Sequence, residues 1–124
     1  MTAARDSSKR RAPRLPTRLD GSLQGRSPRG VRVVDLSLTG CLVQCGALLD
    51  EGAILDLEIR LPDPVAAKVR VTSAYLDGSV GPQESPRFLA GLEFLGIPAR
   101  AEASLRRFLE DERKRRRGAD AAAR

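Results

Sequence analysis

The hexapeptide Asp35-Leu36-Ser37-Leu38-Thr39-Gly40 separates two short apolar runs, residues 31–34 and 41–43. Apolar runs on either side of a short polar segment with a glycine are typical of two β-strands joined by a turn. In an extended segment Asp35 and Ser37 project from the same face, because successive side chains alternate. A carboxylate beside a hydroxyl, followed by a glycine that admits a close neighbour, predicts a compact polar binding edge at this turn.

The rest of the chain also alternates between apolar and polar positions. The clearest half-buried strand covers residues 55–61, where aliphatic and charged side chains alternate. Residues 65–72 repeat the pattern after a turn, and we expect these two strands to pair antiparallel. Further strands are expected over residues 15–24, with an interruption at Gly21, and over residues 88–95. Short strands separated by turn signals predict an all-β fold, an antiparallel barrel of about six to seven strands, with a C-terminal helix.

The sequence divides into four expected parts. These are a flexible basic arm over residues 1–13, the barrel over 14–97, a C-terminal helix over 98–117 and a tail over 118–124. Apolar residues at helical spacing up to Leu109 predict a helix face that caps an end of the barrel. Beyond Leu109 we expect the helix to project into solvent, with solvated arginines at 113–117, and to fray near Gly118.

The net charge of +6 is concentrated at the two ends of the chain. Residues 1–30 hold eight Lys/Arg and two Asp (+6), residues 31–100 six Lys/Arg and nine acids (−3), and residues 101–124 eight and five (+3). Basic ends fit nucleic acid, a membrane surface or a phosphate-bearing small ligand, and composition does not choose among them. No apolar run approaches the ~18 residues of a membrane span, and the charged start lacks a signal-peptide core. We therefore expect a cytoplasmic protein without a membrane span.

The two cysteines, Cys41 and Cys45, are interpreted as core thiols. Four residues apart in a strand, they lie about 13 Å from each other, too far for a disulfide. The chain has no histidine, so a zinc site has almost no ligands to use. With no base beside these thiols, no acid pair in an evident pocket and no phosphate-binding glycine loop, we expect no enzyme, no catalytic residue, no metal and no cofactor.

Three short motifs resemble the PilZ domain, a small bacterial β-barrel that binds cyclic di-GMP. Arg10 and Arg14 match the family's Arg-x-x-x-Arg element, and Asp35, Ser37 and Gly40 match its Asp-x-Ser-x-x-Gly element. Residues 91–94, Gly-Leu-Glu-Phe, resemble the run in its last barrel strand. The resemblance covers roughly residues 9–109 and implies a PilZ-like split barrel in a stand-alone, single-domain member.

The register of the first motif has an alternative, because Arg14 and Arg18 also form an Arg-x-x-x-Arg pair. We prefer Arg10 and Arg14, because Leu15-Pro16 follows the second arginine directly, as the family pattern usually has it. Arg11 points the other way in an extended arm, but it can turn back because the arm is flexible.

The resemblance implies cyclic di-GMP, a ligand with two guanines and two phosphates. A carboxylate accepts from guanine N1–H and N2–H, while an arginine forks onto O6 and N7, stacks on the ring or pairs with phosphate. By resemblance the arginines hold phosphate and guanine, and the Asp-x-Ser-x-x-Gly residues line the guanine pocket. The expected ligand-binding residues are Arg10, Arg11, Arg14, Asp35, Ser37 and Gly40.

The preferred functional hypothesis is a cyclic di-GMP receptor, a monomer or weak dimer, in which the ligand orders the arginine arm against the barrel and signals to an unidentified partner protein. One alternative is a PilZ-like adaptor that does not bind nucleotide. Another is a small basic barrel that binds nucleic acid, although the strands offer few aromatics for stacking and the body is acidic, so DNA is not expected. Each of these residues also has a simpler interpretation. The arginines fit a solvated basic tail, Asp35 and Ser37 fit side chains that satisfy backbone groups at a strand end, and Gly40 fits a β-bulge glycine.

Overall fold

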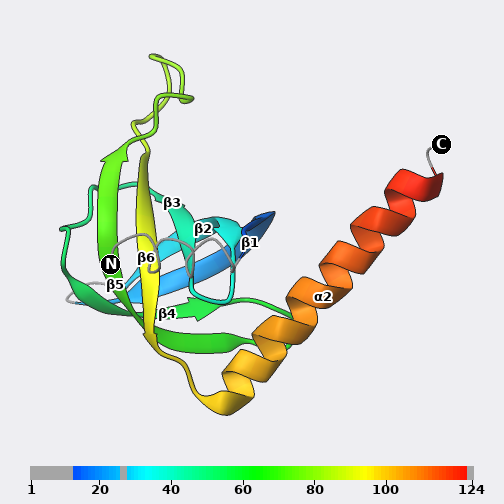
Figure 1. The fold of residues 1–124 in the computed structure, drawn as a ribbon. Helices are drawn as coiled ribbons and strands as arrows, with labels where there is room; N and C mark the ends of the chain where they lie inside the picture. The colour runs from blue at the N-terminus through cyan, green and yellow to red at the C-terminus, as the bar shows by residue number, and fades with distance from the viewer. Residues whose placement is uncertain (1–12, 26–27, 123–124) are drawn as a thin grey trace, which may run out of the picture.

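The computed structural model describes residues 13–25 and 28–122 of the 124-residue chain. The elements in these residues are, in order, β1 (Leu15–Gln24), β2 (Arg29–Leu36), β3 (Gly40–Cys45), β4 (Ile54–Ile59), β5 (Val65–Leu76), β6 (Phe88–Gly96) and α2 (Ala99–Ala122). Figure 1 shows the strands wrapped around one another and α2 running obliquely away from the last of them.

The strands form a closed antiparallel barrel in the order β1-β2-β3-β6-β5-β4, which confirms the predicted fold class. Pairing of β3 with β6 and of β1 with β4 brings together segments that are distant in the sequence. The predicted pairing of the strands around residues 55–61 and 65–72 is observed as β4 with β5.

The predicted interruption at Gly21 is wrong, because β1 continues through it to Gln24. Gly21 pairs with Val31 on one side and Ile59 on the other, and a Cβ here would meet the Glu58 carbonyl oxygen at 2.9 Å. The glycine therefore lets the first strand pass close to β4 where the barrel closes.

The interior of the barrel is mainly aliphatic and is filled by side chains from all six strands. In β5 the alternation is regular over its first eight residues, from Val65 onward. Cys41 is fully buried and Cys45 is 3% exposed, so both thiols lie in the core as predicted. The helix contributes Leu105 and Leu109 to the same core.

The predicted end of the helix is wrong, because α2 continues past Arg117 to Ala122. Its second half also does not simply project into solvent, since Arg113 and Arg116 donate hydrogen bonds to the backbone just before and within the start of β1. The helix thus continues through Gly118, although a glycine inside a helix costs about 1 kcal/mol. Over residues 13–25 and 28–122, no helix is long and apolar enough to span a membrane.

Candidate functional site

The Asp-x-Ser-x-x-Gly segment forms the connection between β2 and β3, as its polar composition predicts. The backbone N–H of Ser37 donates to the Gly40 carbonyl at 2.9 Å, which closes the turn. The Ser37 hydroxyl accepts hydrogen bonds from the N–H groups of Thr39 (3.1 Å) and Gly40 (3.3 Å) and lies 3.2 Å from the Gly40 carbonyl oxygen. Ser37 is only 2% exposed, so its hydroxyl stabilises the turn from within.

Gly40 lies where the backbone of β6 comes close to that of β3. It pairs with Glu93, and a Cβ on Gly40 would overlap the carbonyl oxygen of Leu92. The neighbour that this glycine admits is therefore the backbone of the last strand. The register shift between β2 and β3 lies between Val33 and Asp35, so Gly40 is not the bulge residue.

Asp35 connects β3 to the segment before β1. Its Oδ1 accepts one hydrogen bond from the Leu42 N–H at 3.1 Å and another from Arg14 Nη1, also at 3.1 Å. The side chain of Asp35 is 20% exposed and that of Arg14 is 59% exposed. Because β2 ends at Leu36, the alternation expected from Asp35 to Ser37 is not kept, and the two side chains have different surroundings. The carboxylate faces Arg14, whereas the Ser37 hydroxyl faces its own turn.

The arginines of the two possible registers lie in different places. Arg14 precedes β1 and contacts Asp35, whereas Arg18 lines a groove between β1 and α2 with Phe108 and Glu112. Arg10 and Arg11, the other expected ligand-binding arginines, lie outside the described residues. Of the two alternatives for the second arginine of the motif, Arg14 is the one beside the carboxylate.

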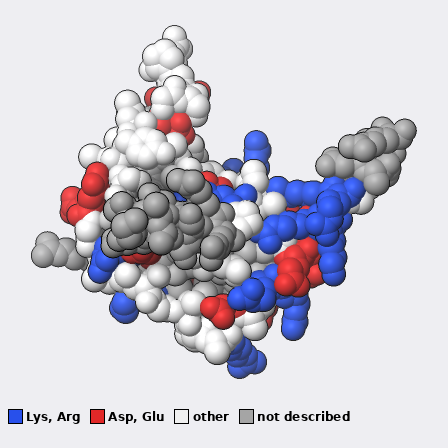
Figure 2. Space-filling view, viewed as in Figure 1, with Lys and Arg blue, Asp and Glu red and all other residues white. Residues whose placement is uncertain are grey.

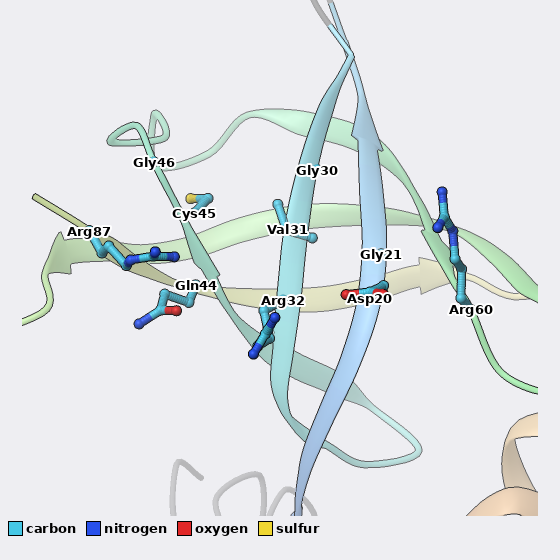
Figure 3. A pocket seen from close by; sticks show the side chains of 10 residues that line it. All are labelled: Asp20, Gly21, Gly30, Val31, Arg32, Gln44, Cys45, Gly46, Arg60 and Arg87. Carbon is cyan, nitrogen blue, oxygen red and sulfur yellow. The ribbon is translucent and has the colours of Figure 1, made fainter. Parts of the chain in front are cut away.

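The structure also shows a cationic hollow of about 310 Å³ on the outer face of the barrel, which the sequence motifs do not include (Figure 3). Asp20, Arg32 and Gln44 lie in one row across β1, β2 and β3, and Arg60 and Arg87 flank them. None of the three arginines forms an ion pair with another described residue. Arg32 lies in β2, whereas Arg60 follows β4 and Arg87 precedes β6, and no local sequence pattern links these three positions.

Asp77 anchors the loop after β5 next to this hollow. Its carboxylate accepts hydrogen bonds from the Ser79 hydroxyl (2.6 Å), the Ser79 N–H (2.9 Å) and Gln44 Nε2 (2.7 Å). These hydrogen bonds lower the pKa of Asp77 below its usual value of 3.8, and the bonds from Ser79 have the largest effect. The loop base and the outer face of β3 are therefore joined through one carboxylate.

The buried thiols carry no evident reactivity. Burial, and after it the nearby Asp35 carboxylate, raises the pKa of the Cys41 thiol from 9.0 to about 12. The Cys45 thiol donates to the Ala47 carbonyl at 3.1 Å. No group of three or more metal-ligating side chains occurs in the part of the chain that the structure describes.

The motifs and the barrel agree with a comparison against known families. The family model for the PilZ domain matches residues 8–111. This chain belongs to the PilZ domain family. No curated protein matches the chain.

Solved structures of PilZ proteins share the fold at low sequence identity. The PilZ domain of YcgR from Escherichia coli, solved with c-di-GMP, has a TM-score of 0.73 at 20% identity, over 90% of this chain and 98% of that one. MotI (DgrA) of Bacillus subtilis, an inhibitor of motility, has a TM-score of 0.71 at 22% identity, over 84% of this chain and 51% of that one. The c-di-GMP complex of K. pneumonia MrkH has a TM-score of 0.66 at 17% identity, over 86% and 54%. This PilZ chain thus spans about half the length of MotI and MrkH.

Proposed function

We propose that this protein is a receptor for cyclic di-GMP and that the ligand binds beside Asp35. The observation that carries the proposal is the contact between Arg14 and Asp35, 21 residues apart, which joins the two PilZ motifs at 3.1 Å. Membership of the PilZ family supports the ligand class, since the related YcgR domain and MrkH were solved with c-di-GMP.

The contact between Arg14 and Asp35 leaves both groups capable of binding a ligand. Both hydrogen bonds to Asp35 go to Oδ1, and within residues 13–25 and 28–122 its Oδ2 accepts none. That oxygen is available for the N1–H and N2–H donors of guanine. Arg14 uses one nitrogen on Asp35, so its other donors and its flat face remain available for guanine O6 and N7, the guanine ring or a phosphate.

Ser37 and Gly40 serve the proposed pocket mainly through the shape of the turn. The Ser37 hydroxyl holds the turn from within, and Gly40 lets β3 lie against β6. Together they keep β3 in register with β2, and this register places the Leu42 N–H against the Asp35 carboxylate. In this proposal Asp35 contacts guanine directly, while Ser37 and Gly40 line the pocket and fix its edge.

The proposal assigns Arg10 and Arg11 to the phosphates and the second guanine. An arm with several arginines fits a doubly charged ligand with two purines, because each guanidinium both pairs with phosphate and stacks on a base. The ligand would then order the arm against the barrel, and the altered surface would signal to a partner protein in the cytoplasm.

Calorimetric titration of cyclic di-GMP, with GTP as a control ligand, tests this proposal. Wild type binds saturably, and its stoichiometry separates one ligand from a stacked pair. Arg14→Ala weakens binding roughly 5- to 150-fold, since a good arginine–guanine fork contributes about 1–3 kcal/mol. Arg18→Ala is the matched control: it removes the same charge from the other register and leaves the affinity within about twofold.

Two results would contradict the proposal. A folded wild-type protein that takes up no cyclic di-GMP at ligand concentrations up to the millimolar range rejects the receptor function and favours an adaptor. Equal losses in Arg14→Ala and Arg18→Ala reject the placement beside Asp35, because a general charge effect then explains binding.

A further inference from the structure

The second half of α2 contacts the chain on both sides of Arg14. Arg113 Nη2 donates to the carbonyl oxygen of Pro13 at 3.3 Å, and Arg116 Nη2 donates to that of Pro16 at 2.5 Å. Each contact joins residues that are 100 positions apart in the sequence. Figure 1 shows the start of β1, in dark blue, extending toward the middle of α2.

These two arginines act from one face of the helix. Arg113 and Arg116 are three residues apart, the spacing at which helical side chains are neighbours. Glu112 stabilises this turn: it accepts a forked pair from Arg115 at 2.7 and 2.9 Å and lies 3.6 Å from Arg116. The hydrogen bonds from Arg115 are the main reason that the pKa of Glu112 is lowered. Figure 2 shows Lys and Arg side chains gathered along α2, and two of its arginines, Arg113 and Arg116, bind the backbone beside Arg14.

The segment they hold offers few backbone donors, although Leu15 and Pro16 pair with β2. Pro13 and Pro16 have no N–H, so residues 13–16 offer two amide donors in place of four. The pairing of β1 with β2 shifts register between Pro16 and Leu19, next to the carbonyl that Arg116 binds. The two arginines of α2 therefore add hydrogen bonds to this segment from outside the sheet.

We infer that Arg113 and Arg116 are positioning residues for Arg14, and that through them the second half of α2 is coupled to the ligand site. This inference rests on the proposed function. Holding the backbone at Pro13 and Pro16 fixes the base of the Arg14 side chain while Asp35 holds its tip. Because coupling between two sites is reciprocal, a ligand that binds Arg14 also changes how tightly α2 binds residues 13–16. The docking of the second half of α2 then depends on whether the site is occupied.

The test compares two double variants of the full chain. Arg113→Ala/Arg116→Ala removes both contacts and keeps good helix formers. Lys114→Ala/Arg117→Ala is the matched control, because it removes the same charge from the same turn, and both side chains are exposed and donate no hydrogen bond to a described residue. Arg116→Lys tests rescue, since a single carbonyl acceptor needs only one donor.

The first readout is ligand affinity. We expect cyclic di-GMP to bind roughly 3- to 10-fold more weakly to Arg113→Ala/Arg116→Ala, as for the loss of about two exposed charge-assisted hydrogen bonds, while the control double variant and Arg116→Lys stay within about twofold of wild type. Wild-type affinity in Arg113→Ala/Arg116→Ala overturns the inference. Equal weakening in both double variants also overturns it, because the loss is then one of charge.

The second readout is hydrogen exchange, measured without ligand and with it. Without ligand, peptides from residues 13–24 exchange faster in Arg113→Ala/Arg116→Ala than in the control double variant. Unchanged exchange overturns the inference that α2 holds residues 13–16, independently of any result with ligand. When ligand is added, exchange across residues 110–117 changes in wild type and does not change in Arg113→Ala/Arg116→Ala. If wild type binds no cyclic di-GMP, the proposed function fails, and the measurement without ligand still decides whether α2 holds residues 13–16.

Discussion

Replacing Gly40 by alanine tests whether the motif glycine acts through the barrel backbone. The added Cβ would overlap the carbonyl oxygen of Leu92 and lie 3.2 and 3.3 Å from Leu92 C and Glu93 Cα. All three are backbone atoms of β6, which pairs directly with β3, so no side-chain rotation relieves the overlap. The two strands must separate locally instead.

The cost follows from overpacking and from weakened strand pairing. Forcing an extra methyl group into a packed site costs about 1–3 kcal/mol, and each ladder hydrogen bond that is stretched loses up to about 1 kcal/mol. We expect Gly40→Ala to lower the free energy of unfolding by about 2–4 kcal/mol. For a chain of this size that corresponds to a fall in Tm of roughly 8–16 °C.

Gly30→Ala is the matched control, because it makes the same change in β2 with no atom within 4 Å of the new Cβ and without a left-handed φ. It should be neutral or stabilise by up to about 1 kcal/mol. Thermal and urea unfolding, followed by circular dichroism, measure both variants. If Gly40→Ala has the same Tm as Gly30→Ala and loses only ligand affinity, a clash with the backbone of β6 is refuted. Gly40 then contacts the ligand itself.

Three further predictions concern the core and the loop base. The Cys41 thiol, whose pKa burial raises to about 12, should resist alkylation at pH 8 until the protein unfolds; rapid labelling of the native protein would contradict its burial. The lowered pKa of Asp77 means that its stabilising effect is complete above pH 3.8 and is lost as the pH falls below that value. Asp77→Asn should therefore be less stable than wild type at pH 7, with the difference narrowing in acid unfolding curves; a constant difference would argue against it. Leu109→Ala should cost about 2–5 kcal/mol in urea unfolding, against less than about 1 kcal/mol for Leu48→Ala, which is 58% exposed; equal effects would mean that α2 is not part of the core.

Much of the fold was predictable because it depends on alternation between neighbouring residues. The pattern over residues 55–61 and 65–72 reports which side of each strand is buried, and that is a local property. The helix face ending at Leu109 was recognisable for the same reason. The end of the helix was not, because the contacts of Arg113 and Arg116 come from residues at the other end of the chain.

The candidate site was predictable in its residue types and only partly in its geometry. The motif indicated that Asp35, Ser37 and Gly40 belong together, but their separate surroundings arise from the turn and from the approach of β6. Alternation assumed that the strand continued to Ser37, whereas β2 ends at Leu36. An extended-strand rule does not apply once the chain turns.

The sequence by itself determined a small barrel with a helix, and the three motifs that identify its family. Only the tertiary structure decided that Arg14 and not Arg18 contacts Asp35, because that choice depends on the pairing of Pro16 with Asp35 across two strands. It also decided that the second half of α2 lies against residues 13–16. The first depends on how the closed barrel sets the register of its strands, and the second on how α2 packs against the barrel. Both are properties of pairs of segments that no single segment encodes.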